Sequence, residues 1–400
     1  MTDHTSEGFA PASEDEAAAT VAAAARGRRP LRLEGGGTQA GLGRPVEAHA
    51  VLSSRALTGL TLHEPAELVV SARSGTPLRD VAAALASAGQ WLPFEPVDLR
   101  SLYGTGGEPT VGGLVAGNWS GPRRIQAGAA RDHLIGVRFV NGRGEVVKSG
   151  GRVMKNVTGL DLVKLQCGAQ GTLGFLTEVT FKVLPRPAMA LTLVFTGLDD
   201  RRGVELLTAA LGSPFEPTGA AHMPPGSGGA GSRTLLRLEG FEASVLYRAD
   251  QLATLLRRFG APTRLDADAA EMLWAAVRDG RFLAEPRERA VWRLSVPPTG
   301  GPALIDALSR QLDFAHLYDW GGGLIWLATA AEGDAGAAAI RAALGAGGGH
   351  ATLLRGPDAL RRRVPVFQPL AAPLAVLAAR VKASFDPDRL LNPGHMVADG

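Results

Sequence analysis

The stretch Leu33-Glu-Gly-Gly-Gly-Thr-Gln39 follows a short apolar strand signal and places three consecutive glycines where that strand ends. Two further segments concentrate glycine in the same way, from Tyr103 to Gly121 and from Gly168 to Gly174. Glycine allows positive φ and leaves space for a ligand to approach main-chain N–H groups, which is how an uncharged loop cradles a diphosphate. Three such loops predict a long, phosphate-bearing ligand, although each loop taken alone is equally well explained as a turn.

The first loop also matches a dinucleotide fingerprint, Gly35-x-Gly37-x-x-Ala40. A Rossmann loop must open a helix that directs its N-terminus at the pyrophosphate, whereas Gly41-Leu-Gly-Arg-Pro45 would break a helix at once. A nucleoside-triphosphate loop is absent, because Val147 stands before Lys148-Ser149 where that loop requires glycine. Nicotinamide and triphosphate ligands are therefore disfavoured.

Composition narrows the classes of protein to which the chain can belong. Its 400 residues suggest about two to three domains, and 45% hydrophobic residues suffice for a core in each. A net charge of +3 is small for this length, so we expect no nucleic-acid partner. The single cysteine, Cys167, excludes an internal disulfide, a four-thiolate iron–sulfur site, a zinc site made of four cysteine ligands and a C-x-x-C-H haem attachment.

No targeting or membrane-spanning segment is recognisable in the sequence. The N-terminus has no Lys or Arg before Arg26 and no long apolar region, unlike a secretory signal. The most apolar late stretch, 370–379, is about half as long as a membrane helix needs and contains Pro373. We therefore expect a cytoplasmic protein, and peripheral contact with the inner face of the membrane through partners stays open.

The remaining signals predict an α+β protein in two main parts. Ser13-Glu-Asp-Glu16 has capping-box spacing ahead of an Ala-rich helix. Strand and helix signals then alternate until a strand over 175–184 stops at Pro185-Arg-Pro187, where we place the first domain boundary. Strand-like runs follow at 191–195, 234–238, 291–296, 323–329 and 351–354, between helical stretches near 201–211, 244–259, 302–312 and 335–344. They predict a second domain with a mostly antiparallel sheet and helices on one face.

Ordered segments carry a resemblance to a known flavoprotein family. They are Leu33-Glu-Gly-Gly-Gly-Thr-Gln39, Pro109-Thr-Val-Gly-Gly-Leu-Val-Ala-Gly-Asn118, Lys155-Asn-Val-Thr-Gly-Leu-Asp161 and Gly171-Thr-Leu-Gly-Phe-Leu-Thr-Glu178. Over residues 28–187 they resemble the family of vanillyl-alcohol oxidase and p-cresol methylhydroxylase (PCMH). Within it, Tyr318-Asp-Trp-Gly-Gly-Gly-Leu-Ile-Trp326 and the ending Phe385-Asp-Pro-Asp-Arg-Leu-Leu-Asn-Pro-Gly394 resemble the smaller FAD-binding subunits of bacterial glycolate oxidases.

The resemblance implies a fold and a cofactor. A partly helical N-terminal extension over 1–27 would precede a two-part PCMH-type FAD-binding domain over 28–187. A cap domain for substrate or subunit interaction would span 188–380, and a C-terminal segment over 381–400 would return to the FAD-binding domain. Many relatives attach the flavin through a histidine in the first loop, whereas Thr38 follows the glycines here. We therefore expect non-covalent FAD.

The resemblance also assigns residues to parts of the FAD. The diphosphate would lie near Gly35–Thr38 and Thr110–Gly113, the ribityl and isoalloxazine groups near Gly117–Ser120, and the adenine end near Gly171–Val179. Lys155 would neutralise the diphosphate or the charge at flavin N1. The expected cofactor-binding residues are Gly35, Gly36, Gly37, Thr38, Gln39, Thr110, Val111, Gly112, Gly113, Gly117, Asn118, Ser120, Lys155, Gly171, Gly174, Glu178 and Val179.

Candidates for the chemistry are fewer. Oxidation of a 2-hydroxy acid by a flavin needs a cation for the carboxylate and a base for the hydroxyl proton. Arg293 is the preferred carboxylate-binding residue, because the family presents such groups on a cap strand; a surface role is the alternative. His395 could lie near the flavin and His133 could act as a base, although a structural role is the favoured interpretation of each. No metal site is expected, since the cap lacks the His-x-Gly-Asp-Gly-Asn segment of related catalytic subunits.

One functional hypothesis and several alternatives follow. We expect the FAD-binding subunit of a glycolate (2-hydroxyacid) oxidase complex, which oxidises glycolate to glyoxylate and passes electrons to an iron–sulfur subunit beside a sister FAD-binding catalytic subunit. The alternatives are a self-sufficient FAD-dependent D-2-hydroxyacid (D-lactate) dehydrogenase, a non-catalytic flavin-domain scaffold for a catalytic sister subunit, and a nicotinamide-dependent reductase.

Overall fold

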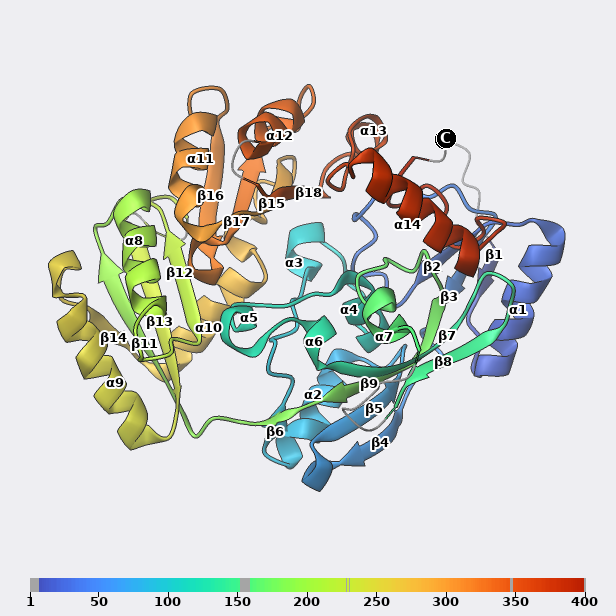
Figure 1. The fold of residues 1–400 in the computed structure, drawn as a ribbon, viewed down its shortest axis with the longest axis horizontal. Coiled ribbons are helices and arrows are strands. Elements are labelled where there is room, and N and C mark those ends of the chain that lie inside the picture. The colour runs from blue at the N-terminus through green and yellow to red at the C-terminus, as the bar shows by residue number, and fades with distance from the viewer. Residues whose placement is uncertain (1–6, 152–158, 228, 230, 346–347, 399–400) are drawn as a thin grey trace.

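The computed structural model describes residues 7–151, 159–227, 229, 231–345 and 348–398. The chain forms two halves that lie side by side (Figure 1). The first half contains the strands β1 (Glu7–Phe9), β2 (Leu31–Glu34), β3 (Ala50–Ser53), β4 (Leu60–Glu64), β5 (Val69–Arg73), β6 (Gln90–Trp91), β7 (Leu134–Val140), β8 (Val146–Gly150), β9 (Phe175–Lys182) and β10 (Leu184–Pro185). Its helices are α1 (Glu14–Gly27), η1 (Pro65–Glu67), α2 (Leu78–Ser87), α3 (Arg100–Tyr103), α4 (Val111–Gly117), α5 (Arg124–Ala127), α6 (Ala130–His133) and α7 (Leu162–Gln166).

Two main sheets organise the first half. A parallel sheet has the strand order β1-β3-β2, and a larger antiparallel sheet has the order β4-β5-β9-β7-β8. The central strand β9 is covered on both faces, since Val179 and Phe181 are buried and so are most of its other residues. Helix α1 begins as the sequence predicts, with the Ser13 hydroxyl accepting a hydrogen bond from Glu16 N at 3.2 Å.

The second half is built on one eight-stranded antiparallel sheet in the order β14-β11-β13-β12-β16-β17-β15-β18. Its strands are β11 (Met189–Thr196), β12 (Gly219–Met223), β13 (Arg233–Gly240), β14 (Thr263–Leu265), β15 (Ala290–Ser295), β16 (Phe314–Asp319), β17 (Leu324–Thr329) and β18 (His350–Arg355). The helical elements are α8 (Asp200–Leu211), α9 (Glu242–Leu255), η2 (Arg257–Phe259), α10 (Ala267–Arg278), η3 (Arg281–Leu283), η4 (Pro298–Gly300), α11 (Gly301–Leu308), η5 (Trp320–Gly322), α12 (Ala337–Gly345) and α13 (Asp358–Arg363). The last helix, α14 (Ala372–Phe385), lies over the first half (Figure 1).

The two faces of the large sheet have different partners. Helices α8, α9, α11 and α12 cover one face, where Trp292 and Leu238 join apolar clusters made of residues of this half alone. The other face packs against the first half, because Leu317 and Trp326 share a buried cluster with Phe94. This arrangement buries side chains of both halves at one interface. It holds the eight-stranded sheet, called the cap sheet below, against the first half.

The C-terminal segment returns to the first half. After α14, Leu391 forms a parallel bridge with Leu31 of β2, and Leu31 N donates to Leu390 O at 2.7 Å. The last described residues therefore lie beside the first glycine-rich loop. In the described part of the chain, no helix is both long and apolar enough to cross a membrane.

Candidate functional site

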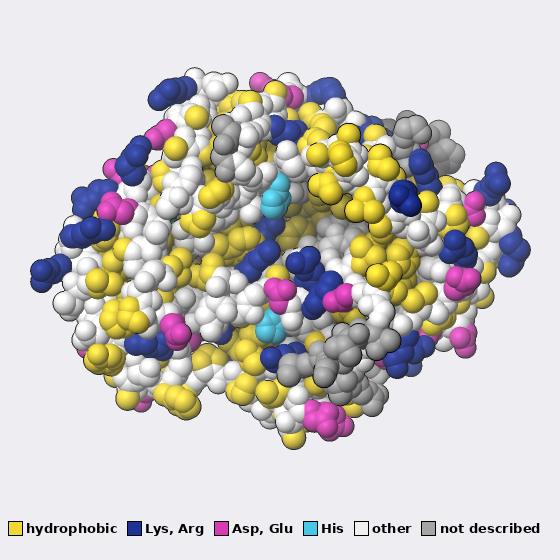
Figure 2. Space-filling model, viewed as in Figure 1, with side chains coloured by type: hydrophobic (Ala, Val, Ile, Leu, Met, Phe, Trp, Pro, Cys, Tyr) yellow, Lys and Arg dark blue, Asp and Glu magenta, His cyan; other side chains and the backbone are white. Residues whose placement is uncertain are grey.

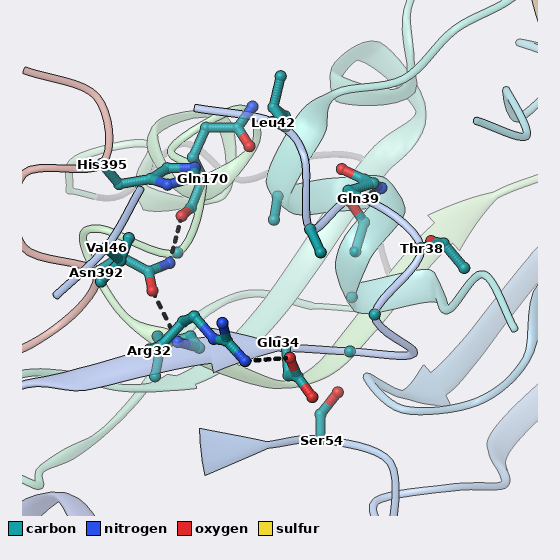
Figure 3. Close-up of a pocket in the computed structure, with 18 of the residues that line it drawn as sticks. Arg32, Glu34, Thr38, Gln39, Leu42, Val46, Ser54, Gln170, Asn392 and His395 are labelled. Carbon is teal, nitrogen blue, oxygen red and sulfur yellow. Dashed lines mark hydrogen bonds and ion pairs between the residues drawn. The ribbon is translucent and has the colours of Figure 1, made fainter. Parts of the chain in front are cut away.

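A pocket of about 310 Å³ lies where the glycine-rich loops meet the C-terminal segment (Figure 3). The first loop, which follows β2, forms one wall, and the loop ahead of α4 forms the next. The third loop, around Gly171, and the C-terminal residues Asn392 and His395 complete it. Segments far apart in the sequence thus converge on one cavity.

Backbone contact between the first two loops requires glycine. A Cβ on Gly36 would lie 1.8 Å from Glu108 O, and a Cβ on Gly107 would lie 1.8 Å from Gly36 O. Thr110 then caps α4, its hydroxyl accepting from Gly113 N at 3.2 Å. The main chains of the two loops therefore pack closely where they meet at the pocket wall.

Asn392 joins the third loop to the first. Its side-chain oxygen accepts a hydrogen bond from Leu33 N at 2.7 Å, and its amide nitrogen donates to Gln170 O at 2.8 Å. Figure 3 shows Asn392 between Gln170 and the strand that carries Arg32. Because Asn392 satisfies backbone groups on both sides, it fixes the distance across this end of the pocket.

Three polar atoms on the pocket walls suit a large polar ligand. Ser74 Oγ, Arg361 Nε and His395 Nδ1 are buried and have no hydrogen-bond partner among the described residues. Buried polar groups in folded proteins are otherwise nearly always paired. Phosphate, ribityl hydroxyl and ring nitrogen atoms offer the acceptors and donors that these groups lack, so the residues present fit FAD.

Most of the expected cofactor-binding residues are brought together at this pocket. Of the expected residues, those that line the pocket are Gly35, Gly36, Gly37, Thr38, Gln39, Thr110, Gly112, Gly113, Gly171 and Gly174. They come from all three loops. Their assignment to particular parts of the FAD remains a prediction.

The other expected cofactor-binding residues that the structure describes do not line the pocket. Val111 is a core residue, and Gly117, Asn118 and Ser120 shape the turn after α4, where Asn118 Oδ1 accepts from Arg131 N at 3.0 Å. Glu178 and Val179 belong to β9. Lys155 lies outside the described residues. The roles of these residues likewise stay predictions.

Several arginines line the pocket although no local sequence motif marks them as ligand-binding residues. Arg361 in α13 donates from its guanidinium to Gly43 O at 2.7 Å and pairs with Asp358. Arg32, Arg44 and Arg362 add positive charge to the walls. Only tertiary packing brings the helix α13 beside the first loop, so no local motif marks these arginines.

His395 lies on the pocket wall and is neutral near pH 7. Burial lowers the pKa of its imidazole to about 4, a hydrogen bond at the backbone of Arg44 opposes the shift, and the nearby charge of Arg361 adds to it. A neutral imidazole can accept a proton. With a pKa of about 4 this imidazole is a weak base at neutral pH, and its place near the flavin stays a prediction.

Arg293 does not line the pocket and lies on the sheet face that meets the first half. Its guanidinium carbon is 4.8 Å from the ring centroid of Trp320 and 6.0 Å from that of Trp119. Trp119 Nε1 in turn donates to Gln39 Oε1 at 2.8 Å. A single indole thus separates Arg293 from a pocket residue.

The predicted base His133 and the single cysteine both have structural surroundings. His133 Nε2 donates to Ala127 O at 2.7 Å, and burial lowers the pKa of this imidazole. Cys167 is buried, and burial raises the pKa of its thiol to about 12. Among the described residues, no group of three or more His, Cys, Asp or Glu side chains could hold a metal ion.

The chain is similar to flavoproteins of known families. Residues 8–150 match the family described as FAD binding domain. The chain is 35% identical over 378 residues to the glycolate oxidase subunit GlcE of Escherichia coli (strain K12), an alignment that covers 93% of this chain and 94% of that protein. It is 30% identical over 187 residues to the glycolate oxidase subunit GlcD of Bacillus subtilis (strain 168), covering 46% and 38%.

Solved structures share the fold at low sequence identity. The 4-ethylphenol oxidase from Gulosibacter chungangensis matches 98% of this chain and 89% of its own with a TM-score of 0.74 and 14% identity. p-Cresol methylhydroxylase matches 98% of this chain and 88% of its own with a TM-score of 0.72 and 14% identity. The expected PCMH-type α+β fold with a large antiparallel sheet is confirmed.

Proposed function

The chain belongs to the glycolate oxidase FAD-binding subunits, within the PCMH-type flavoproteins, and we propose that it acts in a complex that oxidises glycolate to glyoxylate. Its cofactor is FAD, and it is an FAD-linked oxidoreductase. The observation that carries the proposal is the convergence of three glycine-rich loops and Asn392 on one pocket whose buried polar atoms suit this cofactor.

Bound FAD supplies the two-electron acceptor for oxidation of a CH–OH group to a carbonyl. The loops and α13 hold the cofactor, and the absence of a histidine after the glycines supports non-covalent attachment. Arg293, whose guanidinium lies against Trp119 and Trp320, binds the substrate carboxylate. The two indoles exclude water from that carboxylate, which strengthens its attraction to the guanidinium.

A partner must carry the electrons onward. The chain has one cysteine, and its buried thiol stands alone, whereas an iron–sulfur cluster needs about four thiolates. If the acceptor is a quinone reached by one-electron steps, an iron–sulfur subunit of the complex receives the electrons. A sister FAD-binding subunit of the GlcD kind, to which this chain is 30% identical over 187 residues, shares the complex.

An apolar surface supports the subunit form over a self-sufficient dehydrogenase. Leu370, Leu374, Val376 and Leu377 each expose between 50% and 60% of their surface, and helix α14 has no buried residue. In Figure 2 hydrophobic side chains gather over α14 beside the central hollow. Contiguous apolar patches of this kind mark protein–protein contacts.

The proposal is tested on the purified chain and on the co-expressed complex. Absorbance near 450 nm, followed by heat release of the chromophore, measures FAD and its attachment together, and we expect yellow protein that releases all its flavin (roughly one per chain). The complex should reduce an artificial acceptor with glycolate. A chain that holds no flavin would contradict the proposal, and glycolate or D-lactate oxidation by the chain alone at the rate of the complex would favour the self-sufficient dehydrogenase.

A further inference from the structure

Two guanidinium groups from different halves of the molecule meet at one indole ring. The guanidinium carbon of Arg124, in α5, is 4.5 Å from the ring centroid of Trp320, and that of Arg293, in β15, is 4.8 Å from it. Trp320 itself crosses the interface, since its Nε1 donates to Gly121 O at 3.0 Å. Both cations thus lie close to the centre of one indole that is fixed to both halves, and the charge of Arg124 reaches Arg293.

Neither cation has a carboxylate partner among the described residues. The neighbouring arginines differ, because Arg123 pairs with Glu239 and Arg237 pairs with Glu95 at the same interface. A partly buried charge without a counter-ion is costly, and two like charges side by side raise that cost. Burial and the charge of Arg124 lower the pKa of Arg293 to about 10.

The nearest acids are committed elsewhere. Asp319 accepts a hydrogen bond from Trp320 N at 2.7 Å, and Asp132 accepts one from Ala129 N at 2.8 Å. Each influences one guanidinium only through its charge, Asp319 on Arg293 and Asp132 on Arg124. An external anion would supply the negative charge that the interface does not provide for Arg124 and Arg293.

The arginine pair lies next to the cofactor pocket rather than on an outer surface. Trp119 stands between Arg293 and Gln39, which lines the pocket. Figure 2 shows Lys and Arg side chains gathered in the hollow between the two halves. His350 is close enough for both guanidiniums to lower its pKa, although burial is the larger cause.

We propose that Arg124 and Arg293 together bind one carboxylate group of a short 2-hydroxy acid, so that the ligand bridges the two halves across Trp320. The inference rests on the proposed function for the identity of the reaction and adds Arg124 to the site. Two planar guanidiniums can each donate paired hydrogen bonds to a carboxylate. The bridging position makes ligand binding also a contact between the cap sheet and α5.

The test measures oxalate binding to the FAD-loaded chain by titration calorimetry. Arg124→Gln and Arg293→Gln should each weaken binding at least about tenfold, because a hydrogen bond to a charged group contributes on the order of a factor of ten. Arg131→Gln is the matched control, since Arg131 is an exposed neighbour of Arg124 that does not contact Trp320. It should change the affinity less than about threefold.

Several outcomes would overturn the inference. Unchanged oxalate affinity in Arg124→Gln would mean that Arg124 does not contact the carboxylate. An equal loss of affinity in Arg131→Gln would mean that oxalate is attracted by the overall positive charge of this region and not by a specific pair of arginines. Should a Gln variant not fold, Arg124→Met and Arg293→Met keep a long stem against the indole and must give the same losses. If the FAD-loaded chain does not bind oxalate, the anion site is overturned and the proposed function stands. If the purified chain retains no FAD and still binds oxalate, the proposed function is contradicted and the anion site stands.

Discussion

Two hydrogen bonds, of 2.8 and 2.9 Å, join the guanidinium of Arg237 in β13 to the carboxylate of Glu95 in the first half. Burial alone would raise the pKa of Glu95, but Arg237 and Arg123 outweigh it and the pKa is lowered. Glu95 also accepts from Arg123 N at 2.8 Å. The Glu95–Arg237 ion pair thus links the two halves, and it is called the latch below.

Glu95→Gln should weaken the latch strongly. The neutral amide removes the carboxylate that holds two hydrogen bonds from the buried Arg237 and leaves only Glu239, 3.7 Å from Arg237 Nε, as its counter-ion. Breaking a buried pair in this way costs about 3 kcal/mol. Urea denaturation of the flavin-loaded chain measures the free energy of unfolding. Glu205→Gln is the control, because Glu205 pairs with Arg258 on the surface and its loss should cost less than about 1 kcal/mol. Equal losses in the two variants would show that the latch does not stabilise the fold.

Gly36→Ala should abolish FAD retention. The new Cβ would lie 1.8 Å from Glu108 O, so the first two loops must separate where they form the pocket. Gly106→Ala is a matched control in the same loop region, since a Cβ there meets nothing within 4 Å. Flavin absorbance after gel filtration checks both, and retention of FAD in Gly36→Ala at the level of Gly106→Ala would contradict this account of the pocket.

The sequence predicted the parts of the fold that depend on local pattern. Helix α1, capped by Ser13, follows the predicted segment, and so do β9 and β15. The prediction missed β16 and α10, because Phe314–Asp319 is short and ends at a glycine-rich turn, while the polar start of α10 masks its apolar face. Such elements are stabilised by the neighbours that they pack on, which a local pattern does not contain.

The site shows the same division between local and tertiary information. Glycine runs marked the three loops because glycine is needed wherever backbones approach closely. Arg361 and Arg124 were missed, because one of 37 arginines gains a role only through the surface that it meets. Arg293 was found from the family resemblance, and no feature of its flanking residues indicates the second guanidinium beside it.

Asn392→Asp should weaken FAD binding with little effect on the isolated fold. The amide N–H that donates to Gln170 O is replaced by a carboxylate oxygen that repels this carbonyl, so the third loop moves away from β2. We expect roughly a tenfold higher dissociation constant for FAD, measured by flavin fluorescence on reconstitution, from the loss of about one hydrogen bond. Asp388→Asn, on the exposed turn just before, serves as the control. Identical constants for the two variants would remove Asn392 from the site.

Asp319→Asn should stabilise the protein in a pH-dependent way. Burial raises the pKa of Asp319 to about 7 in the folded chain, above the value of 3.8 for an unperturbed group. The folded state then binds more protons than the unfolded state between about pH 4 and 7, so the free energy of unfolding falls as the pH rises through this window. Asn keeps the acceptor for Trp320 N and does not titrate.

The melting temperatures of the two proteins should therefore diverge from about pH 4 upward and differ by a constant amount above about pH 7, equivalent to at least about 1 kcal/mol. The charges that face Asp319 are Glu95, Arg237 and Arg293, and they are the same in both proteins. Asp268→Asn, on the exposed side of α10, is the control and should show no such divergence. A pH-independent difference for Asp319→Asn would mean that the carboxylate stays charged in the fold.

Leu374→Glu combined with Leu377→Glu should prevent assembly with the sister FAD-binding subunit. The two leucines lie one turn apart on α14 and expose 55% and 56% of their surface, and Val376 exposes 60% on another side of the helix. Because apolar groups face out in more than one direction, a groove on a protein covers them better than the flat surface of a bilayer. Co-purification of the co-expressed subunits should fall at least tenfold (about 1.4 kcal/mol), while the variant keeps its FAD. Arg380→Glu, at an exposed and already charged position of the same helix, is the matched control, and full assembly of the double variant would place the partner elsewhere.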